Sequence, residues 1–178
     1  MPLHLKSRDM SAELEGYESV LIVSCPVCPP VSLASDKGMP LIEFFKSGLK
    51  TRAYEDHIRD MRESLEQRGV RTGVFTSHLP TTAMCLWTTG QRNRLLKRAK
   101  GYQAAVVMGC ESARYTVEET LKGTDCAVLL AMQLVGITNA KLKFKWPLTV
   151  ELEDLARIDA NEQREVEPAS LGRVRASS

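Results

Sequence analysis

The chain has 178 residues, 43% of them hydrophobic and 26% charged, and its net charge is +2. A chain of this length suits one domain of ordinary size, which buries a core without disulfides or metals to hold it together. The near-neutral charge argues against nucleic acid or a membrane surface as a partner, and no apolar run approaches the roughly 20 residues of a membrane span. Residues 1–17 are polar and mixed in charge, so we expect a loosely docked extension rather than a signal peptide.

Five cysteines in a chain without an export signal predict a reducing, cytoplasmic location. In that compartment cysteine binds metals or takes part in catalysis more often than it forms disulfides. Five buried structural cysteines are the simplest alternative, because cysteine outside disulfides is among the most buried residue types. The proline-rich sequence Cys25-Pro-Val-Cys28-Pro-Pro argues against this alternative, since it places two thiols in a loop.

The first half of the chain predicts two strands that are separated by a cysteine loop and two helices. The apolar run before Cys25 contains several β-branched residues and is typical of a buried strand. Apolar residues recur at helical spacing from Tyr54 to Leu65 and predict an amphipathic helix. The expected boundaries are strand 18–24, loop 25–38, helix 40–48, helix 52–68 and strand 70–76.

The second half predicts a basic helix, a third strand and a run of short elements. A capping-box pattern, Thr116-x-x-Glu119, indicates where a helix begins, and strict alternation from Lys141 to Trp146 indicates an edge strand with one wet face. The expected boundaries are helix 91–100, strand 103–108, helix 116–123, helix 127–135, strand 141–146, helix 150–158 and a polar tail at 159–178. This order predicts an α/β domain over residues 18–158, with a small doubly wound, flavodoxin-like sheet of four parallel strands.

The helix expected at 91–100 carries five basic residues, which are Arg92, Arg94, Lys97, Arg98 and Lys100. Such a cluster occurs in nucleic-acid-binding proteins, but no aromatic residues are interleaved with these charges. We therefore interpret it as the solvated face of a helix, and we favour an acidic protein over nucleic acid as a partner.

Four cysteines follow strands of the predicted sheet. Cys25 and Cys28 come directly after the first strand, and Cys85 follows the second. Cys110 follows the third strand through Gly109. Because the carboxyl ends of parallel strands lie along one edge of a sheet, where α/β folds build their sites, we expect these thiols to converge there. Four thiols at one edge predict a metal site.

Three chemistries are open to these cysteines. An iron–sulfur cluster of two or four irons usually takes four thiolates, and one Cys-x-x-Cys pair with two distant cysteines is an acceptable spacing. Structural zinc accepts the same ligands but commonly shows two close pairs. Thiol–disulfide exchange by Cys25 and Cys28 needs the pair at the start of a helix. Pro29 and Pro30 follow at once and disfavour a helix through the pair.

The order of these motifs resembles the iron–sulfur (delta) subunit family of methyl-viologen-reducing hydrogenase, a small protein that links a hydrogenase to heterodisulfide reductase. Its members begin with a strand that runs into Cys-x-x-Cys, followed by a single cysteine after the second strand and by Gly-Cys after the third. The matching residues here are Cys25, Cys28, Cys85, Gly109 and Cys110.

Two later segments, Leu134–Ile137 and Lys141–Trp146, are similar to the family's Gly-Ile segment and to the strand that follows it. The resemblance therefore covers residues 18–158. The chain departs from the family at Tyr115, where members have a further cysteine, and in a longer segment near residues 31–68.

The resemblance implies one iron–sulfur cluster, which we expect to be a 2Fe-2S cluster, in an electron-transfer subunit with no substrate of its own. The implied ligands are Cys25, Cys28, Cys85 and Cys110. The implied partners are a flavin-containing, heterodisulfide-reductase-like subunit and a hydrogenase or formate dehydrogenase module. The alternative is a scaffold that is stabilised by zinc or acts through its thiols, without electron transfer. His78 is either a further ligand or a hydrogen-bonded loop residue, and we expect Cys126 in the core.

Overall fold

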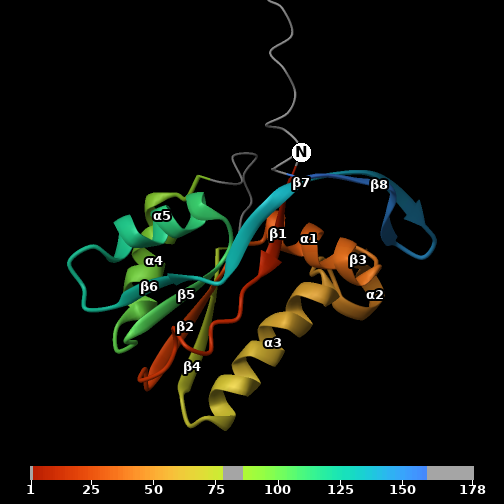
Figure 1. Cartoon of the computed structure of the whole chain (residues 1–178). Coiled ribbons are helices and arrows are strands. Elements are labelled where there is room, and N and C mark those ends of the chain that lie inside the picture. Colours follow the sequence, from red (N-terminus) through yellow and green to blue (C-terminus); the bar gives the residue numbers. More distant parts are fainter. Residues whose placement is uncertain (1, 78–85, 160–178) are drawn as a thin grey trace, which may run out of the picture.

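Two four-stranded sheets organise the chain in the computed structural model, which describes residues 2–77 and 86–159 (Figure 1). The strands are β1 (Leu3–Ser7), β2 (Ser19–Ser24), β3 (Ile42–Glu43), β4 (Arg71–Thr76), β5 (Ala104–Met108), β6 (Ala127–Leu130), β7 (Met132–Lys145) and β8 (Thr149–Asp159). The helices are α1 (Cys28–Lys37), α2 (Phe44–Ser47), α3 (Arg52–Gln67), α4 (Thr89–Ala99) and α5 (Glu111–Leu121). Within these residues no helix is both long enough and apolar enough to cross a membrane.

One sheet is fully parallel, with the strand order β4-β2-β5-β6. Along its central strand β2, Val20 and Ile22 pack with α1 and α3 on one face. Leu21 and Val23 pack with α4 and α5 on the other face. The prediction of a mixed α/β protein with a four-stranded parallel sheet is therefore confirmed. The chain runs from β2 outward to β4 and then returns to the other side of β2 to form β5 and β6, so the order of the strands switches between β2 and β5. The crossover after β2 therefore covers one face of the sheet, and the crossovers after β4 and β5 cover the other.

The fourth strand of the parallel sheet is β6, which lies in a stretch that we expected to be helical. The helix predicted at 127–135 is wrong, because Ala127 to Leu130 pair in parallel with β5. A short apolar run fits a buried strand and a buried helix equally well, and here the edge of β5 provides a strand partner. Residues 141–146, which we expected to be the fourth parallel strand, belong instead to the antiparallel strand β7.

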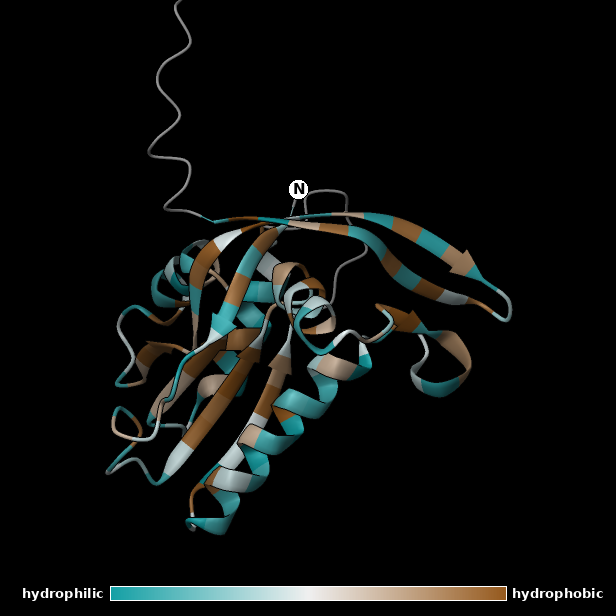
Figure 2. Cartoon of the chain, turned by 45° about the vertical axis from the view of Figure 1, so that its right-hand side comes forward, coloured by the Kyte–Doolittle hydropathy of each residue, from teal (hydrophilic) through white to brown (hydrophobic). Residues whose placement is uncertain are grey.

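The second sheet has the order β1-β7-β8-β3 and is antiparallel. The helix predicted at 150–158 is also wrong, because these residues form β8, which pairs with β7 from Thr149 to Asp159. Apolar and charged residues alternate along both strands of this hairpin, a period of two that fits strands rather than helices. The alternation appears in Figure 2 as brown and teal bands.

Helix α1 begins at Cys28 and occupies the stretch up to residue 37 that we expected to be a loop. Pro29 and Pro30 lie in its first turn, where a missing N–H leaves no intrahelical hydrogen bond unmade and the fixed φ favours a helix. Gly38 ends the helix in the left-handed conformation, with φ of 59°. The two prolines therefore start the helix rather than prevent it.

Two other elements differ from the prediction. Helix α5 begins at Glu111 rather than at Thr116, whose hydroxyl donates to the Ser112 carbonyl at 2.9 Å inside the helix and caps nothing. The helix expected at 40–48 is reduced to the two residues of β3 and the single turn α2.

The strands β2, β4 and β5 and the helices α3 and α4 form where the sequence predicted them. Helix α4 buries Leu95 and Ala99 and leaves Arg94, Lys97 and Arg98 exposed. Its basic cluster therefore lies on a solvated helix face, as expected.

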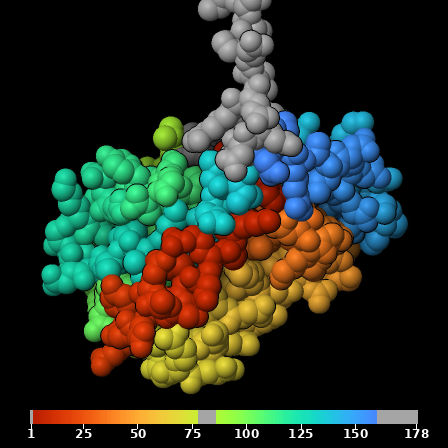
Figure 3. Space-filling model, in the orientation of Figure 1, coloured from red at the N-terminus to blue at the C-terminus, as the bar shows by residue number. Residues whose placement is uncertain are grey.

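The N-terminal residues that we expected to be loosely docked are part of the packed structure. Strand β1 pairs with β7 in antiparallel fashion, and Leu5, Met10 and Leu14 are buried. Ser32 of α1 holds the other edge of β1, because its Oγ accepts the N–H of Leu5 at 3.0 Å. Figure 3 shows these N-terminal residues in red, packed between α3 in yellow and the segment around β7 in cyan.

Replacing Leu5 by alanine tests this docking. The side chain is 0% exposed and belongs to the core that α1 and α3 cover. We therefore expect the free energy of unfolding to fall by about 2–4 kcal/mol, as measured by urea unfolding followed by circular dichroism. Leu86→Ala is the control, since Leu86 is 72% exposed. A loss for Leu5→Ala no larger than that of the control would show that β1 is not docked.

His4 joins the second sheet to α1. Its ring is 2% exposed, and Nδ1 lies 2.9 Å from Oγ1 of Thr138 on β7. Nε2 lies 3.3 Å from Oδ1 of Asp36 on α1, outside hydrogen-bond geometry. The same oxygen pairs with Arg157 of β8 at 2.7 Å. Burial lowers the pKa of His4; Arg157 and Lys6 lower it further, and Asp36 opposes them.

Because the folded protein holds His4 neutral, the unfolded chain takes up its proton first as the pH falls. We expect stability to be lost as the pH drops below about 6.5, with a slope of at most about 1.4 kcal/mol per pH unit for one histidine. Burial lowers the pKa of His57 as well, so this residue contributes in the same direction. Urea unfolding at about pH 5 and about pH 7.5 measures the loss, and His4→Gln should reduce it. An equal pH dependence in His4→Gln would contradict this role.

Candidate functional site

Three of the four predicted ligands lie in the described part of the chain. Cys25 follows β2 directly and Cys28 is the first residue of α1, and each is 8% exposed. Cys110 is the N-cap residue of α5 and comes two positions after the end of β5, where it is partly exposed. Cys85 and His78 lie outside the described residues.

Cys25 and Cys110 follow neighbouring strands. Strands β2 and β5 pair in parallel with Ser24 opposite Met108, so both cysteine-bearing segments leave the sheet at its carboxyl edge. The backbone N–H of Cys25 donates to the Met108 carbonyl at 3.1 Å and extends the ladder beyond the last strand residue. This edge lies at the switch point between β2 and β5, where open α/β sheets bind their ligands.

Gly109 allows these two segments to approach each other closely. A Cβ at this position would lie 3.2 Å from Cβ of Cys25 and 2.8 Å from Cβ of Ala113. The second distance is shorter than real side chains tolerate, so only glycine fits between Cys25 and the first turn of α5. The Gly-Cys pair therefore has a packing reason that is independent of any resemblance.

Tyr54 of α3 contacts the same junction. Its hydroxyl donates to the Met108 carbonyl at 3.1 Å, and this oxygen also accepts the N–H of Cys25. The side chain is 3% exposed, and burial raises the pKa of Tyr54 far above its ordinary value. The hydroxyl therefore stays protonated and holds the end of β5 in place. Helical spacing placed Tyr54 on the inner face of its helix, but no sequence signal indicated this hydrogen bond.

The end of β4 brings a buried hydroxyl to this edge. The N–H of Ser77 donates to the Ser24 carbonyl at 3.3 Å, so β4 ends beside β2. The Ser77 side chain is 1% exposed, and its Oγ has no hydrogen-bond partner among the described residues. A buried hydroxyl without a partner costs about 1–3 kcal/mol. Proteins usually satisfy such a group with another protein group or an ordered water.

Within residues 2–77 and 86–159, no three histidine, cysteine, aspartate or glutamate side chains lie close enough to hold one metal ion. Cys25, Cys28 and Cys110 nevertheless supply the soft thiolates that iron–sulfur clusters and zinc prefer. A four-thiolate centre at this edge needs Cys85 as well. The donor chemistry fits a thiolate-bound metal, but these three thiols are not gathered into one metal-binding group, and the complete ligand set stays a prediction.

Cys126 lies at the opposite end of the sheet. It comes directly before β6, at the amino edge, and packs against the core beside α4 and α5. Burial raises the pKa of its thiol, and the residue lines a cavity of about 350 Å³ together with Leu96 and Tyr102. Since the strands are parallel, this cysteine is remote from the carboxyl edge, in keeping with a structural role.

Comparison with known proteins identifies no relative: no family model, no curated protein and no solved structure matches the chain. The resemblance to the hydrogenase delta subunit family therefore rests on the cysteine motifs and the two later sequence segments alone. Function has to be inferred from the residues at the carboxyl edge.

Proposed function

We propose that this protein is an electron-transfer subunit that carries one iron–sulfur cluster, a 2Fe-2S cluster, at the carboxyl edge of the parallel sheet. The proposed ligands are Cys25, Cys28, Cys85 and Cys110. The observation that supports this most is the junction of Cys25 with Met108 and Gly109, which brings two cysteine-bearing segments together at the switch point. A metal site needs a rigid backbone at the segments that carry its ligands. The Met108 carbonyl provides this here, because it accepts hydrogen bonds from both Cys25 and Tyr54.

The surrounding residues have roles that suit such a centre. When bound, the cluster would supply one-electron transfer at a potential set by its protein environment. The burial of Cys25 and Cys28 limits access of water to their sulfurs. Tyr54 fixes the end of β5, and Ser77 offers a hydroxyl donor that no described residue uses.

We infer the partners from the same chemistry. A protein that only relays electrons needs a donor and an acceptor, and the family resemblance suggests a flavin-containing, heterodisulfide-reductase-like subunit. A hydrogenase or formate dehydrogenase module would stand at the other end of the relay. The flavodoxin-like class is supported by the strand order, in which the first parallel strand along the chain, β2, lies between the second, β4, and the third, β5. A cytoplasmic location follows from the cysteine content.

A second candidate function is thiol–disulfide exchange by Cys25 and Cys28. The observation in its favour is the start of α1 at Cys28, since prolines in the first turn do not prevent the helix. In exchange proteins a cysteine at a helix N-terminus attacks a partner disulfide, a mixed disulfide forms, and the second cysteine displaces the partner as a dithiol. A zinc-stabilised scaffold uses the same cysteines without any redox change.

Spectroscopy on protein purified without air separates these functions. For the electron-transfer subunit we expect visible absorption that dithionite bleaches, together with an electron paramagnetic resonance signal in the reduced state. A colourless protein whose Cys25 and Cys28 become linked on mild oxidation, as shown by peptide mass spectrometry, would favour thiol exchange. A colourless protein that holds zinc and shows no resonance signal would favour the scaffold.

A further inference from the structure

The β7–β8 hairpin has one charged face and one apolar face. On the charged face, three lysines of β7 each pair with an acidic residue of β8, and the pairs are Lys141 with Asp154, Lys143 with Glu153 and Lys145 with Glu151. On the apolar face, Leu142 lies opposite Leu152 and Phe144 lies opposite Val150. The charges of these three pairs therefore compensate one another.

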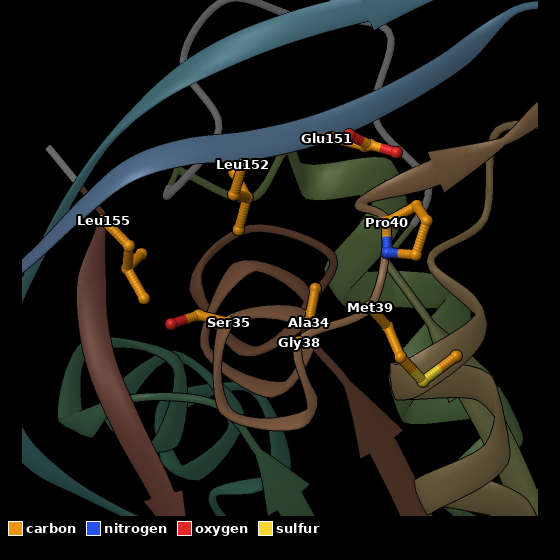
Figure 4. A pocket seen from close by; sticks show the side chains of 8 residues that line it. All are labelled: Ala34, Ser35, Gly38, Met39, Pro40, Glu151, Leu152 and Leu155. Atoms are coloured by element: carbon orange, nitrogen blue, oxygen red, sulfur yellow. The ribbon is translucent and has the colours of Figure 1, made fainter.

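Among the described residues, only the inner part of this apolar face is covered by other elements. Leu152 and Leu155 of β8 point toward Ala34 and Ser35 of α1, with a cavity of about 290 Å³ between them (Figure 4). Beyond α1 the hairpin projects from the body of the molecule (Figure 1). Phe144 is 76% exposed there.

The turn of the hairpin lies beside α2, and the two segments form one apolar surface. Strand β3 pairs with the start of β8, and the N–H of Phe44 donates to the Leu148 carbonyl at 3.2 Å. Exposure is high throughout, reaching 92% for Trp146 and 72% for Phe45. We call these exposed side chains together the hairpin tip; it consists of Phe44, Phe45, Leu49, Phe144, Trp146 and Leu148.

We propose that the hairpin tip is the surface through which two copies of this chain associate. Four aromatic side chains and two leucines at these exposures present on the order of 700 Å² of apolar surface. That is the area which one partner contributes to an interface of standard size, and it exceeds the largest apolar patch of a typical monomer, about 300–600 Å².

The chemistry of the tip favours a second copy over a charged partner. The three lysines of the hairpin are already paired, and the whole chain carries a net charge of only +2. An apolar surface of this size, whose flanking Lys46 is paired with Glu43, is typical of homodimer interfaces, which are more apolar than transient ones. A two-fold axis at the tip would bury the aromatic side chains of both copies at once.

Sedimentation velocity of the full chain over a dilution series tests this proposal. We expect the mass of two chains for the wild type, and Phe144→Lys should raise the dissociation constant roughly thirtyfold or more, as removal of a central anchor does. The control is Tyr115→Lys, because Tyr115 is 64% exposed on α5, outside the tip. Circular dichroism checks that both variants are folded.

A wild-type chain that sediments as one copy at every concentration would overturn the proposal. A dimer that survives Phe144→Lys unchanged would overturn it too, because another surface would then hold the copies together. Binding of the wild-type tip to lipid vesicles or to another protein, with no self-association, would assign the surface to that other occupant. The sedimentation test does not need a bound iron–sulfur cluster. The dimer proposal can therefore fail while the electron-transfer proposal holds, and the electron-transfer proposal can fail while the dimer proposal holds.

Discussion

Replacing Gly109 by alanine is expected to lower the free energy of unfolding by about 2 kcal/mol. The new Cβ would lie 2.8 Å from Cβ of Ala113 and 3.2 Å from Cβ of Cys25, so α5 or the segment after β2 must move. Neither can move cheaply, because the N–H of Cys25 is bound to the Met108 carbonyl next to Gly109. Urea unfolding of the metal-free, reduced protein measures the change.

Gly90→Ala is the matched control for this substitution. A Cβ at Gly90 meets only Oγ1 of Thr88, at 3.9 Å, and Gly90 lies in the first turn of α4. We expect no loss of stability there, and a gain of up to about 1 kcal/mol from the better helix propensity of alanine. If Gly109→Ala costs no more than Gly90→Ala, the close approach of the two cysteine-bearing segments is not real.

Replacing Cys25 or Cys110 by alanine is expected to reduce bound iron at least roughly tenfold, since each removes one of four thiolate ligands. Cys126→Ala should leave the iron content unchanged, because Cys126 lies at the amino edge, before β6. Iron and acid-labile sulfide per chain, measured on protein reconstituted without air, give the comparison. Equal losses in all three variants would point to general destabilisation instead of ligation.

The central strands and the long helices could be predicted because their local patterns agree with their environment. Strand β2 holds the apolar run Val20–Val23 between two serines and is buried along its whole length. Helix α3 repeats its apolar residues at helical spacing, so it buries Tyr54, Ile58 and Leu65. For such elements the period of the sequence is enough.

The second sheet could not be predicted, because its strands depend on partners that are remote in the sequence. Strand β1 pairs with residues of β7 more than 120 positions away, so its first residues look like a polar extension when taken alone. Residues 127–135 are an apolar run that fits either a helix or a strand. Pairing with the edge of β5 makes the first part of this run a strand. Apolar and charged residues alternate in 150–158, and this period of two favours a strand. The prediction of a helix there did not take this alternation into account.

The positions of the cysteines followed from the strand ends, but the supporting residues did not. Cys25 and Cys110 come where β2 and β5 end, which the apolar runs before them indicate. The sequence does not show that the Met108 carbonyl accepts two hydrogen bonds, or that the buried Ser77 hydroxyl finds no partner among the described residues. Such features arise from the packing of α3 and β4 against β2, and no local motif encodes them.

The most direct test of the electron-transfer proposal is the iron, zinc and acid-labile sulfide content of the full chain purified without air, together with its absorption spectrum. We expect iron and sulfide in equal amounts, about two of each per chain, with visible absorption typical of a cluster. Zinc without sulfide, or no metal at all even after reconstitution, would contradict an iron–sulfur centre at Cys25, Cys28, Cys85 and Cys110.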